Sequence, residues 1–243
     1  MPWKTTSVEV TQIKDERLAK DIDTIEQAVV EEKDYEKTLK LIEVAENNFD
    51  NNEIDKSVLC MLKVITYYKQ GTPSWKCDFH NYGELSKGGA LICISVMDKN
   101  IPAVKRYNII PVQVLDTMLS QYGFDVNIDV PTPKLGIVDA LFSACMLGNQ
   151  ENVKILLAHK ANIHKRYAFI DNGTILHLAA GMMHKDISYQ SIYQLLLEAG
   201  ADENAKDDNN DTPVIIKQAV ATSSGCLMYM LVTIAVLTFA VIL

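Results

Sequence analysis

The chain has no basic cluster and no excess of positive charge. It carries 23 Lys and Arg residues against 31 Asp and Glu residues, which gives a net charge of −8 at pH 7. Nucleic-acid phosphates are bound by grouped lysines and arginines, so this balance argues against a nucleic-acid partner. Residues 1–30 are polar and charged and contain no apolar run typical of a secretory signal. The five cysteines are scattered and odd in number, which together with the missing signal predicts free thiols in a reducing compartment.

The sequence also lacks a recognisable catalytic or metal-binding motif. Cys77 and His80 have a spacing seen in zinc sites, but no second Cys or His pair nearby completes four ligands. The acidic run Asp207–Asp211 lacks the downstream glutamate of a calcium-binding loop. Gly88-Gly89 alone is too short for a phosphate-binding loop. We therefore expect no enzyme activity, no cofactor and no metal ion.

Two stretches of the chain, residues 138–167 and 172–206, are imperfect copies of one pattern. The first copy reads DALFSACMLGNQENVKILLAHKANIH from Asp139, and the second reads TILHLAAGMMHKDISYQSIYQLLLEAGADENA from Thr174. Thr174 follows Asp139 by 35 residues, a period typical of stacked helical repeats. The second copy has about five extra residues near Met183–Gln190, which are expected to lengthen the turn between its two helices.

Each position of the pattern has a physical role. Thr174 can cap a first helix, and Gly200 can end a second helix in the left-handed conformation. In the first copy, Lys160 stands at the position of that glycine. Apolar residues at helical spacing give both helices of each copy a buried face. These residues are Leu141, Ala144, Val153, Ile155, Leu156 and Leu157 in the first copy, and Leu176, Ala179, Ala180, Leu195, Leu196 and Leu197 in the second.

This pattern resembles the ankyrin repeat, most closely over residues 138–206. The resemblance implies an all-α fold in which three to four helical units stack into a short ankyrin-repeat solenoid. It implies a role in binding other proteins rather than in catalysis. It also implies that His177, at the histidine position of the repeat signature, supports a turn and takes no part in chemistry.

Weaker copies flank the two strong ones, and a repeat array needs roughly three or more units to bury a continuous core. Residues 208–219 resemble the start of a further repeat that opens at Thr212-Pro213. Upstream, residues 114–127 resemble a second helix with its terminal turn, and residues 89–97 resemble the matching first helix. An insertion at about residues 101–111 separates these two helices. We expect the array to extend over residues 83–222.

The N-terminal region, residues 1–82, lies outside the resemblance. Apolar residues recur at helical spacing in three stripes over residues 14–70, which predicts three amphipathic helices in a small bundle or a cap on the array. Residues 71–88 are rich in turn formers and carry Trp75, Phe79 and Tyr82. They form either a packed connector or a partner-binding loop. Packing is favoured because exposed aromatic side chains are the rarer case.

The C-terminal residues 226–243 read CLMYMLVTIAVLTFAVIL and contain no charged side chain. A helix over residues 225–243 spans about 28 Å, close to a hydrocarbon core of roughly 30 Å. A helix that lies on a membrane surface requires a polar face, and this segment has none. We predict a transmembrane segment at residues 223–243 that resembles a tail anchor, with the N-terminal region and the repeats in the cytosol. The alternative is an apolar helix buried in a soluble fold.

The tip between the two strong copies, residues 165–169, combines charge with aromatic side chains, as interface anchors do. Internal packing is the alternative role for these residues and for a second group at residues 182–184. The predicted partner-binding residues are Lys165, Arg166, Tyr167 and Phe169, followed by Met182, Met183 and His184.

The leading hypothesis is a membrane-tethered ankyrin-repeat adaptor that binds a protein partner on the cytosolic face of a membrane. One alternative is an enzyme whose N-terminal region acts on a target delivered by the repeats. Another is a soluble scaffold with a buried apolar tail.

Overall fold

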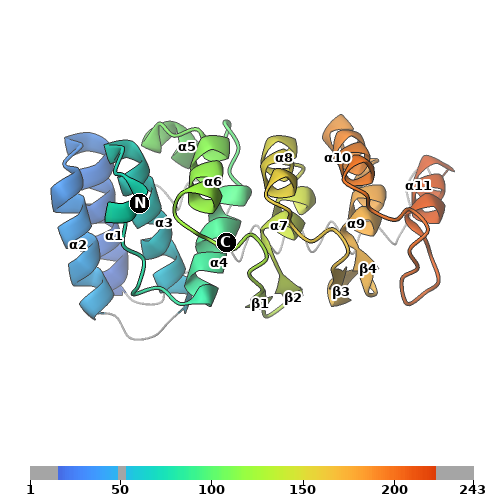
Figure 1. The fold of residues 1–243 in the computed structure, drawn as a ribbon, viewed down its shortest axis with the longest axis horizontal. Coiled ribbons are helices and arrows are strands. Elements are labelled where there is room, and N and C mark those ends of the chain that lie inside the picture. Colours follow the sequence, from blue (N-terminus) through green and yellow to red (C-terminus); the bar gives the residue numbers. More distant parts are fainter. Residues whose placement is uncertain (1–15, 49–52, 223–243) are drawn as a thin grey trace. The chain divides into compact units, whose positions relative to one another are not determined.

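The computed structural model describes residues 16–48 and 53–222, and helices dominate them (Figure 1). These residues form two compact units, divided between Ile128 and Asp129. The transmembrane segment predicted for residues 223–243 lies outside the described residues. Within the described part of the chain, no helix combines the length and the apolar character that a membrane crossing needs.

The first unit is a set of packed helices joined by short connections. The helices of residues 16–70 are the three predicted ones, except that the first continues into a π-helical segment. α3 packs against both α2 and α4, and α6 packs against α4 and α3. In chain order the elements are α1 (Glu16–Gln27), the π-helical η2 (Ala28–Glu32), α2 (Tyr35–Asn48), α3 (Glu53–Gln70), the 3₁₀ turn η3 (Ser74–Lys76), α4 (Glu84–Ser95), α5 (Pro102–Tyr107) and α6 (Pro111–Ser120).

Apolar stripes at helical spacing explain this packing. Ile22, Ile25 and Val29 are at most 1% exposed, and their i, i+3, i+7 spacing puts them on one helix face. Burying one such side chain stabilises the fold by about 1.5–3 kcal/mol. The contact between α3 and α4 is especially close at Gly89, where an added Cβ would lie 2.2 Å from Ser57 Oγ. Glycine is therefore required there for the two helices to approach.

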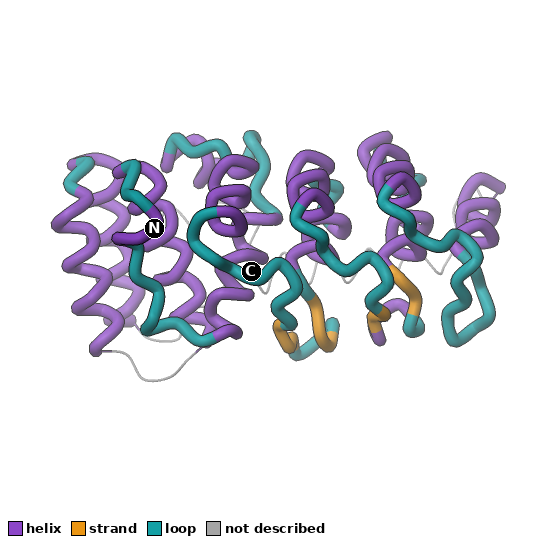
Figure 2. The backbone as a smooth tube through the Cα atoms, viewed as in Figure 1, coloured by secondary structure: helices purple, strands orange, loops and turns teal. Residues whose placement is uncertain are grey.

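The second unit alternates hairpins with antiparallel helix pairs. α7 packs against α8 and α9, and α9 packs against α10 and α11. Figure 2 shows both hairpins at the same edge of this unit. The elements are β1 (Val130–Thr132), β2 (Gly136–Val138), α7 (Ala140–Met146), α8 (Gln150–Ala158), β3 (Arg166–Tyr167), the 3₁₀ turn η4 (Ala168–Ile170), β4 (Gly173–Thr174), α9 (Ile175–Met182), α10 (Ile187–Glu198) and α11 (Pro213–Thr222).

Helix ends in the second unit follow the predicted local chemistry. The Asp139 side chain caps α7 by accepting a hydrogen bond from the Phe142 N–H at 2.8 Å. Thr174 and His177 form a capping box at the start of α9. The second helices end in left-handed residues, with φ of +64° at Lys160 and +96° at Gly200.

The extra residues of the second strong copy lie mainly in a helix, so the prediction of a longer turn is wrong. α10 has 12 residues against 9 in α8, whereas the turns 183–186 and 147–149 differ by one residue. The added helical turn is stable because it buries Tyr189, whose hydroxyl donates a hydrogen bond to the Met146 carbonyl at 2.9 Å. The ring of Tyr189 packs close to Gly148.

The flanking helices overlap their predicted segments, but α4 begins at Glu84, five residues before the predicted start at residue 89. α11 starts directly after Thr212, whose hydroxyl accepts a hydrogen bond from the Ile215 N–H at 3.3 Å. Upstream, α4 and α6 pack together as the predicted first and second helices, and α5 occupies the insertion between them. Because α4 also packs against α3, the first compact unit continues past residues 82–83. The predicted boundary between the N-terminal region and the repeat array, after residue 82, stays a prediction.

Candidate protein-binding surface

The two hairpins of the second unit present apolar side chains to solvent at neighbouring tips. In the register of the first hairpin, Pro131 lies opposite Ile137, and Ile137 is 52% exposed. The turn η4, which carries the half-buried Phe169, packs against β2. Arg166 is exposed on the adjoining strand. We refer to Pro131, Ile137, Arg166 and Phe169 as the fingertip surface.

Arg166 is held in place by backbone carbonyls. Its Nη1 donates hydrogen bonds to the Asn172 carbonyl at 2.8 Å and to the Lys206 carbonyl at 2.7 Å. These bonds connect the second hairpin to the loop that precedes α11. Because the acceptors are carbonyls and the side chain is exposed, the guanidinium keeps its charge and further N–H donors for a partner.

A buried polar network supports this surface from below. Asp139 Oδ2 accepts hydrogen bonds from Lys165 Nζ and from the Tyr167 hydroxyl, each at 2.9 Å. Lys165 Nζ also pairs with Asp129, and the ring of Tyr167 packs against Phe142 with centroids 4.7 Å apart. The network therefore joins the first hairpin, the start of α7 and the second hairpin.

Burial and pairing shift the pKa values in this network. Burial lowers the pKa of Lys165, but the hydrogen bonds to Asp129 and Asp139 outweigh that effect, and the pKa is raised. Burial and then the charge of Asp139 raise the pKa of Tyr167 above its ordinary range. At neutral pH the lysine is charged and the tyrosine is neutral, which are the forms that donate to Asp139.

The structure separates the predicted partner-binding residues into two groups. Tyr167 is 1% exposed and Met182 is 0% exposed, so neither contributes to the surface. Tyr167 is buried because its hydroxyl and ring find partners on α7, which the sequence pattern does not reveal. Lys165 is used mainly in the network and its side chain is 16% exposed.

The remaining predicted residues are accessible. Arg166 and His184 are exposed, and Phe169 and Met183 are half-buried. His184 lies on the turn between α9 and α10, with Nδ1 3.0 Å from the Gly181 carbonyl. Their role in binding a partner stays a prediction. Pro131 and Ile137 were missed, although turn formers at residues 131–136 between apolar residues are a hairpin signal.

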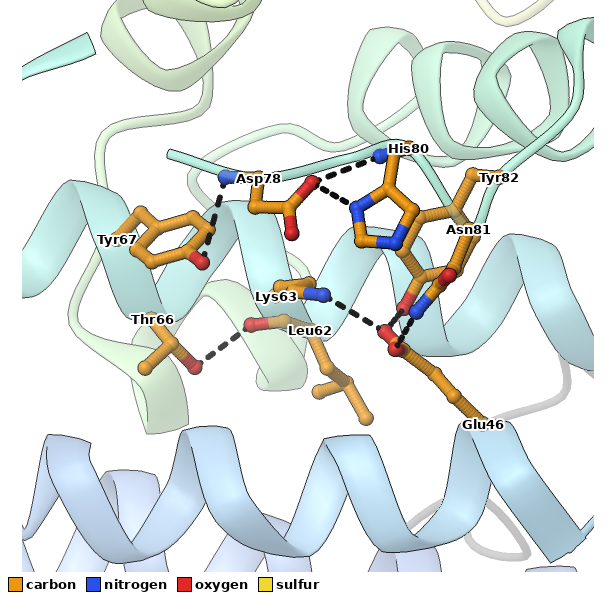
Figure 3. A network of polar contacts seen from close by, with 9 residues as sticks. All are labelled: Glu46, Leu62, Lys63, Thr66, Tyr67, Asp78, His80, Asn81 and Tyr82. Carbon is orange, nitrogen blue, oxygen red and sulfur yellow. Dashed lines mark hydrogen bonds and ion pairs between the residues drawn. The ribbon is translucent and has the colours of Figure 1, made fainter. Parts of the chain in front are cut away.

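A second polar network lies in the first unit and centres on the Glu46 carboxylate (Figure 3). It accepts hydrogen bonds from Lys63 Nζ at 2.9 Å, from Asn81 Nδ2 at 2.8 Å and from the Tyr82 hydroxyl. The side chains of Glu46 and Lys63 are 6% and 9% exposed. These groups satisfy one another and join α2, α3 and the connector 71–83, which gives the network a structural role.

Two of the three aromatic side chains on the connector between α3 and α4 pack inward, as predicted. Phe79 and Tyr82 are buried, whereas Trp75 is 78% exposed and departs from that expectation. On the same connector, the Asp78 carboxylate accepts hydrogen bonds from the backbone and the ring of His80, which lower the pKa of Asp78.

No metal site is formed by the residues that the structure describes, since no three His, Cys, Asp or Glu side chains are grouped to hold an ion. Cys60, Cys77, Cys93 and Cys145 are free thiols. Burial raises the pKa of Cys93 to about 11, and it also raises the pKa values of Cys60 and Cys145. These three thiols are therefore protonated at neutral pH.

Comparison with known proteins gives one family. Residues 103–207 match the family model described as ankyrin repeats (3 copies). The matched stretch contains both strong copies, the two hairpins and the upstream helices α5 and α6. Residues 208–222 lie beyond the match. A search of curated proteins finds no match to this chain.

Proposed function

Residues 103–207 of this chain are ankyrin repeats, and from this premise we propose that the protein binds a protein partner through the fingertip surface. Ankyrin repeats are typically non-catalytic interaction modules. We further propose that residues 223–243 tether the chain to a membrane, with the N-terminal region and the repeats on its cytosolic face. Partner binding (the binding half) and membrane tethering (the tethering half) are supported by different observations and are tested separately.

Binding of a protein partner is supported by the exposed apolar side chain of Ile137 beside the oriented guanidinium of Arg166. Ile137 is 52% exposed on β2, against which η4 packs, and Arg166 is oriented by two backbone carbonyls. The network around Asp139 fixes both hairpins before any partner arrives. A surface that is already ordered loses less conformational entropy on binding, which favours affinity.

The binding half is tested by identifying a partner of the full chain by cross-linking and then measuring its dissociation constant. Ile137→Asp is expected to weaken binding by about tenfold or more, because a carboxylate replaces a buried apolar contact in the complex. Ile187→Asp is the matched control, since Ile187 is 74% exposed in the same unit but lies at the start of α10. Equal effects of the two substitutions, with circular dichroism unchanged, would remove the fingertip surface from the proposal.

The tethering half is supported by the sequence alone. Residues 226–243 contain no charged side chain, and a helix over residues 225–243 would be about 28 Å long, which matches the hydrocarbon thickness. Ten of the residues 226–243 are Leu, Ile, Val or Phe, which contribute about −0.3 to −0.6 kcal/mol each toward insertion.

Fractionation of the full chain against a chain ending at Thr222, which keeps α11 whole, tests the tether. Carbonate washing removes proteins that only adhere to membranes. Retention of the full chain alone would support the tether. If both proteins stay soluble, the apolar tail belongs to the fold or to self-association, and this half of the proposal is wrong.

A further inference from the structure

The connector between α3 and α4 presents an aromatic side chain to solvent. Trp75 is 78% exposed, and its neighbours Pro73, Ser74 and Lys76 are exposed as well. Exposed tryptophan is uncommon, since this large apolar side chain is usually buried to a high degree. The connector lies outside the ankyrin match and takes no part in the fingertip surface.

The backbone of this connector is ordered by hydrogen bonds. The Thr72 N–H donates to the Tyr67 carbonyl at 3.0 Å, which fixes the start of the loop to the end of α3. The Lys76 N–H donates to the Pro73 carbonyl at 2.9 Å, and this bond closes the 3₁₀ turn that carries Trp75. The exposure of Trp75 is therefore a property of an ordered turn.

An aromatic cluster forms around Phe79, further along the same connector. The ring of Phe79 lies 5.6 Å from Tyr67, 5.5 Å from Tyr122 and 5.2 Å from Phe124, measured between centroids. Phe79, Tyr67 and Phe124 are buried in this cluster. Trp75 takes no part in the cluster, and its closest aromatic-type contact is with the ammonium of Lys76, 4.9 Å from its ring.

The 3₁₀ turn itself carries one lysine and no acidic side chain. Residues 69–77 contain Lys69 and Lys76 and no Asp or Glu, and the exposed Asp78 follows directly. Lys69 is partly buried and donates to the Tyr107 carbonyl at 2.6 Å. Lys76 has no ion pair with any residue that the structure describes, so its charge is available to an external anion.

We propose that residues 72–76 form a membrane-contact loop, in which Trp75 enters the headgroup region of a phospholipid bilayer and Lys76 meets a lipid phosphate. Tryptophan is enriched at membrane–water interfaces because its ring is apolar and its N–H can donate a hydrogen bond. Lysine extends its charged end toward the phosphates while its alkyl stem stays near the apolar layer.

The inference rests on the proposed tether. One tryptophan and one lysine bind a bilayer weakly by themselves, and a membrane anchor in the same chain raises their effective concentration at the lipid surface. With the anchor inserted, this contact would restrict how the first unit is oriented at the membrane.

Fluorescence of Trp75 in lipid vesicles tests the inference. The full chain carrying Trp3→Phe has Trp75 as its sole tryptophan, because the sequence contains two. This protein is reconstituted into phosphatidylcholine–phosphatidylserine vesicles with or without brominated lipid. Bromine near the headgroup is expected to lower Trp75 emission by about twofold or more, since quenching requires contact with the lipid. The further substitution Lys76→Glu in the Trp3→Phe protein is expected to reduce this quenching.

A matched control places the tryptophan elsewhere on the same unit. Val44 is 54% exposed on α2, so a chain with Trp3→Phe, Trp75→Phe and Val44→Trp carries one exposed tryptophan on a helix instead of on the connector. Its emission is expected to be unchanged by brominated lipid and to be quenched by aqueous iodide. Equal bromine quenching of the two proteins would overturn the specific role of Trp75.

Flotation of the vesicles separates the two proposals. A chain that does not float with the vesicles would contradict both the tether and the lipid contact. If the chain floats and Trp75 is quenched by iodide but not by brominated lipid, the tether stands and the contact loop is wrong. If neither agent quenches Trp75, a protein surface covers it, and the contact loop is again wrong.

Discussion

At the scale of single residues, His177 connects two segments of the second unit. Its Nδ1 accepts a hydrogen bond from the Thr174 N–H at 2.9 Å, and its Nε2 lies 3.3 Å from the Asp211 carbonyl. An acceptor at Nδ1 and a donor at Nε2 define a neutral imidazole, so protonation removes the first of these bonds. Burial lowers the pKa of His177 below its ordinary value of 6.5.

This shift predicts a dependence of stability on pH. The unfolded chain binds a proton at the ordinary pKa of 6.5, whereas the folded chain resists protonation to lower pH. The contribution of His177 is therefore complete above pH 6.5 and is lost as the pH falls toward the folded-state pKa. Urea unfolding is expected to give a lower midpoint at about pH 5.5 than at about pH 7.5.

The same measurement on two variants assigns that dependence to one residue. His177→Gln is expected to lower stability by about 1–3 kcal/mol at neutral pH, since it disturbs a buried hydrogen-bonded group, and to flatten the slope between the two pH values. His164→Gln, at an exposed position, is the control and should keep the slope. An unchanged slope in His177→Gln would assign the pH dependence to other groups.

Lys160 gives a second prediction, which concerns backbone conformation. Its φ of +64° is one that side chains with a Cβ rarely adopt, and glycine occupies the equivalent position at Gly200. Lys160→Gly is expected to stabilise the protein by about 0.5–1 kcal/mol, because relief of strain exceeds the added entropy of the unfolded chain. Thermal unfolding measures this difference.

The reverse substitution is the control for this prediction. An added Cβ at Gly200 would meet nothing within 4 Å, so Gly200→Ala changes backbone preference without a clash. It is expected to destabilise the protein by about 1 kcal/mol. If Lys160→Gly is no more stable than the parent protein, the lysine side chain stabilises the fold by as much as its left-handed backbone conformation destabilises it.

The local roles of Thr174, His177 and Gly200 could be predicted from the sequence because capping and chain reversal depend on residues close in sequence. The burial of Tyr167 could not, since it depends on Asp139 and Phe142, which lie on another element. The exposure of Ile137 depends likewise on the register of a hairpin that no periodic pattern marks. Two of the four residues of the fingertip surface, Pro131 and Ile137, could therefore be identified only from the structure.

At the scale of elements, the network around Glu46 determines how α2, α3 and the connector are joined. The Glu46 carboxylate accepts three hydrogen bonds, and the Lys63 ammonium also lies 5.4 Å from the centre of the Tyr82 ring. Because both charges are more than nine-tenths buried, each depends on the other for its stability.

Removing one charge of this pair is predicted to be more harmful than removing both. Lys63→Met is expected to destabilise the first unit by about 3–5 kcal/mol, because it leaves the Glu46 carboxylate buried without a cation. The triple variant Glu46→Leu, Lys63→Met, Tyr82→Phe is expected to recover most of that loss. Equilibrium unfolding of the three proteins measures both quantities. A triple variant less stable than Lys63→Met would contradict the argument.

Helix α10 shows how far element boundaries could be predicted. The copy comparison gave the position and size of the insertion, because the residues on either side of it still match. It did not give the conformation, since a helix of 12 residues is favoured only once Tyr189 has the Met146 carbonyl and Gly148 to pack against. The helices of residues 16–70 were predicted more directly, because their apolar stripes are periodic.

At the scale of the whole molecule, the described residues form two compact units, each with its own buried side chains. The ankyrin match runs from residue 103 to residue 207 and so includes residues of both units. In repeat proteins, stability is approximately a sum of unit stabilities and nearest-neighbour terms, so local damage need not spread along the chain.

Hydrogen exchange on Lys63→Met is predicted to show this locality. Loss of the cation beside Glu46 should lower the free energy of amide protection in α3 and α4. The decrease should equal the whole loss of unfolding free energy in Lys63→Met, since α3 carries Lys63 and packs against α4. Amides of α9 and α10 should keep the protection that they have in the parent protein. Mass spectrometry of peptides from these helices gives both values in one experiment.

Tyr189→Phe is the converse variant and decides between local and global unfolding. It removes the donor to the Met146 carbonyl and is expected to lower protection in α7 and α10 by about 1–2 kcal/mol while α3 is unchanged. If either variant lowers protection equally in both units, the described chain opens as one cooperative body. In that case, a partner bound at the fingertip surface would stabilise the first unit as much as the second. Binding raises the free energy of unfolding of every part of the chain that opens together with the binding site.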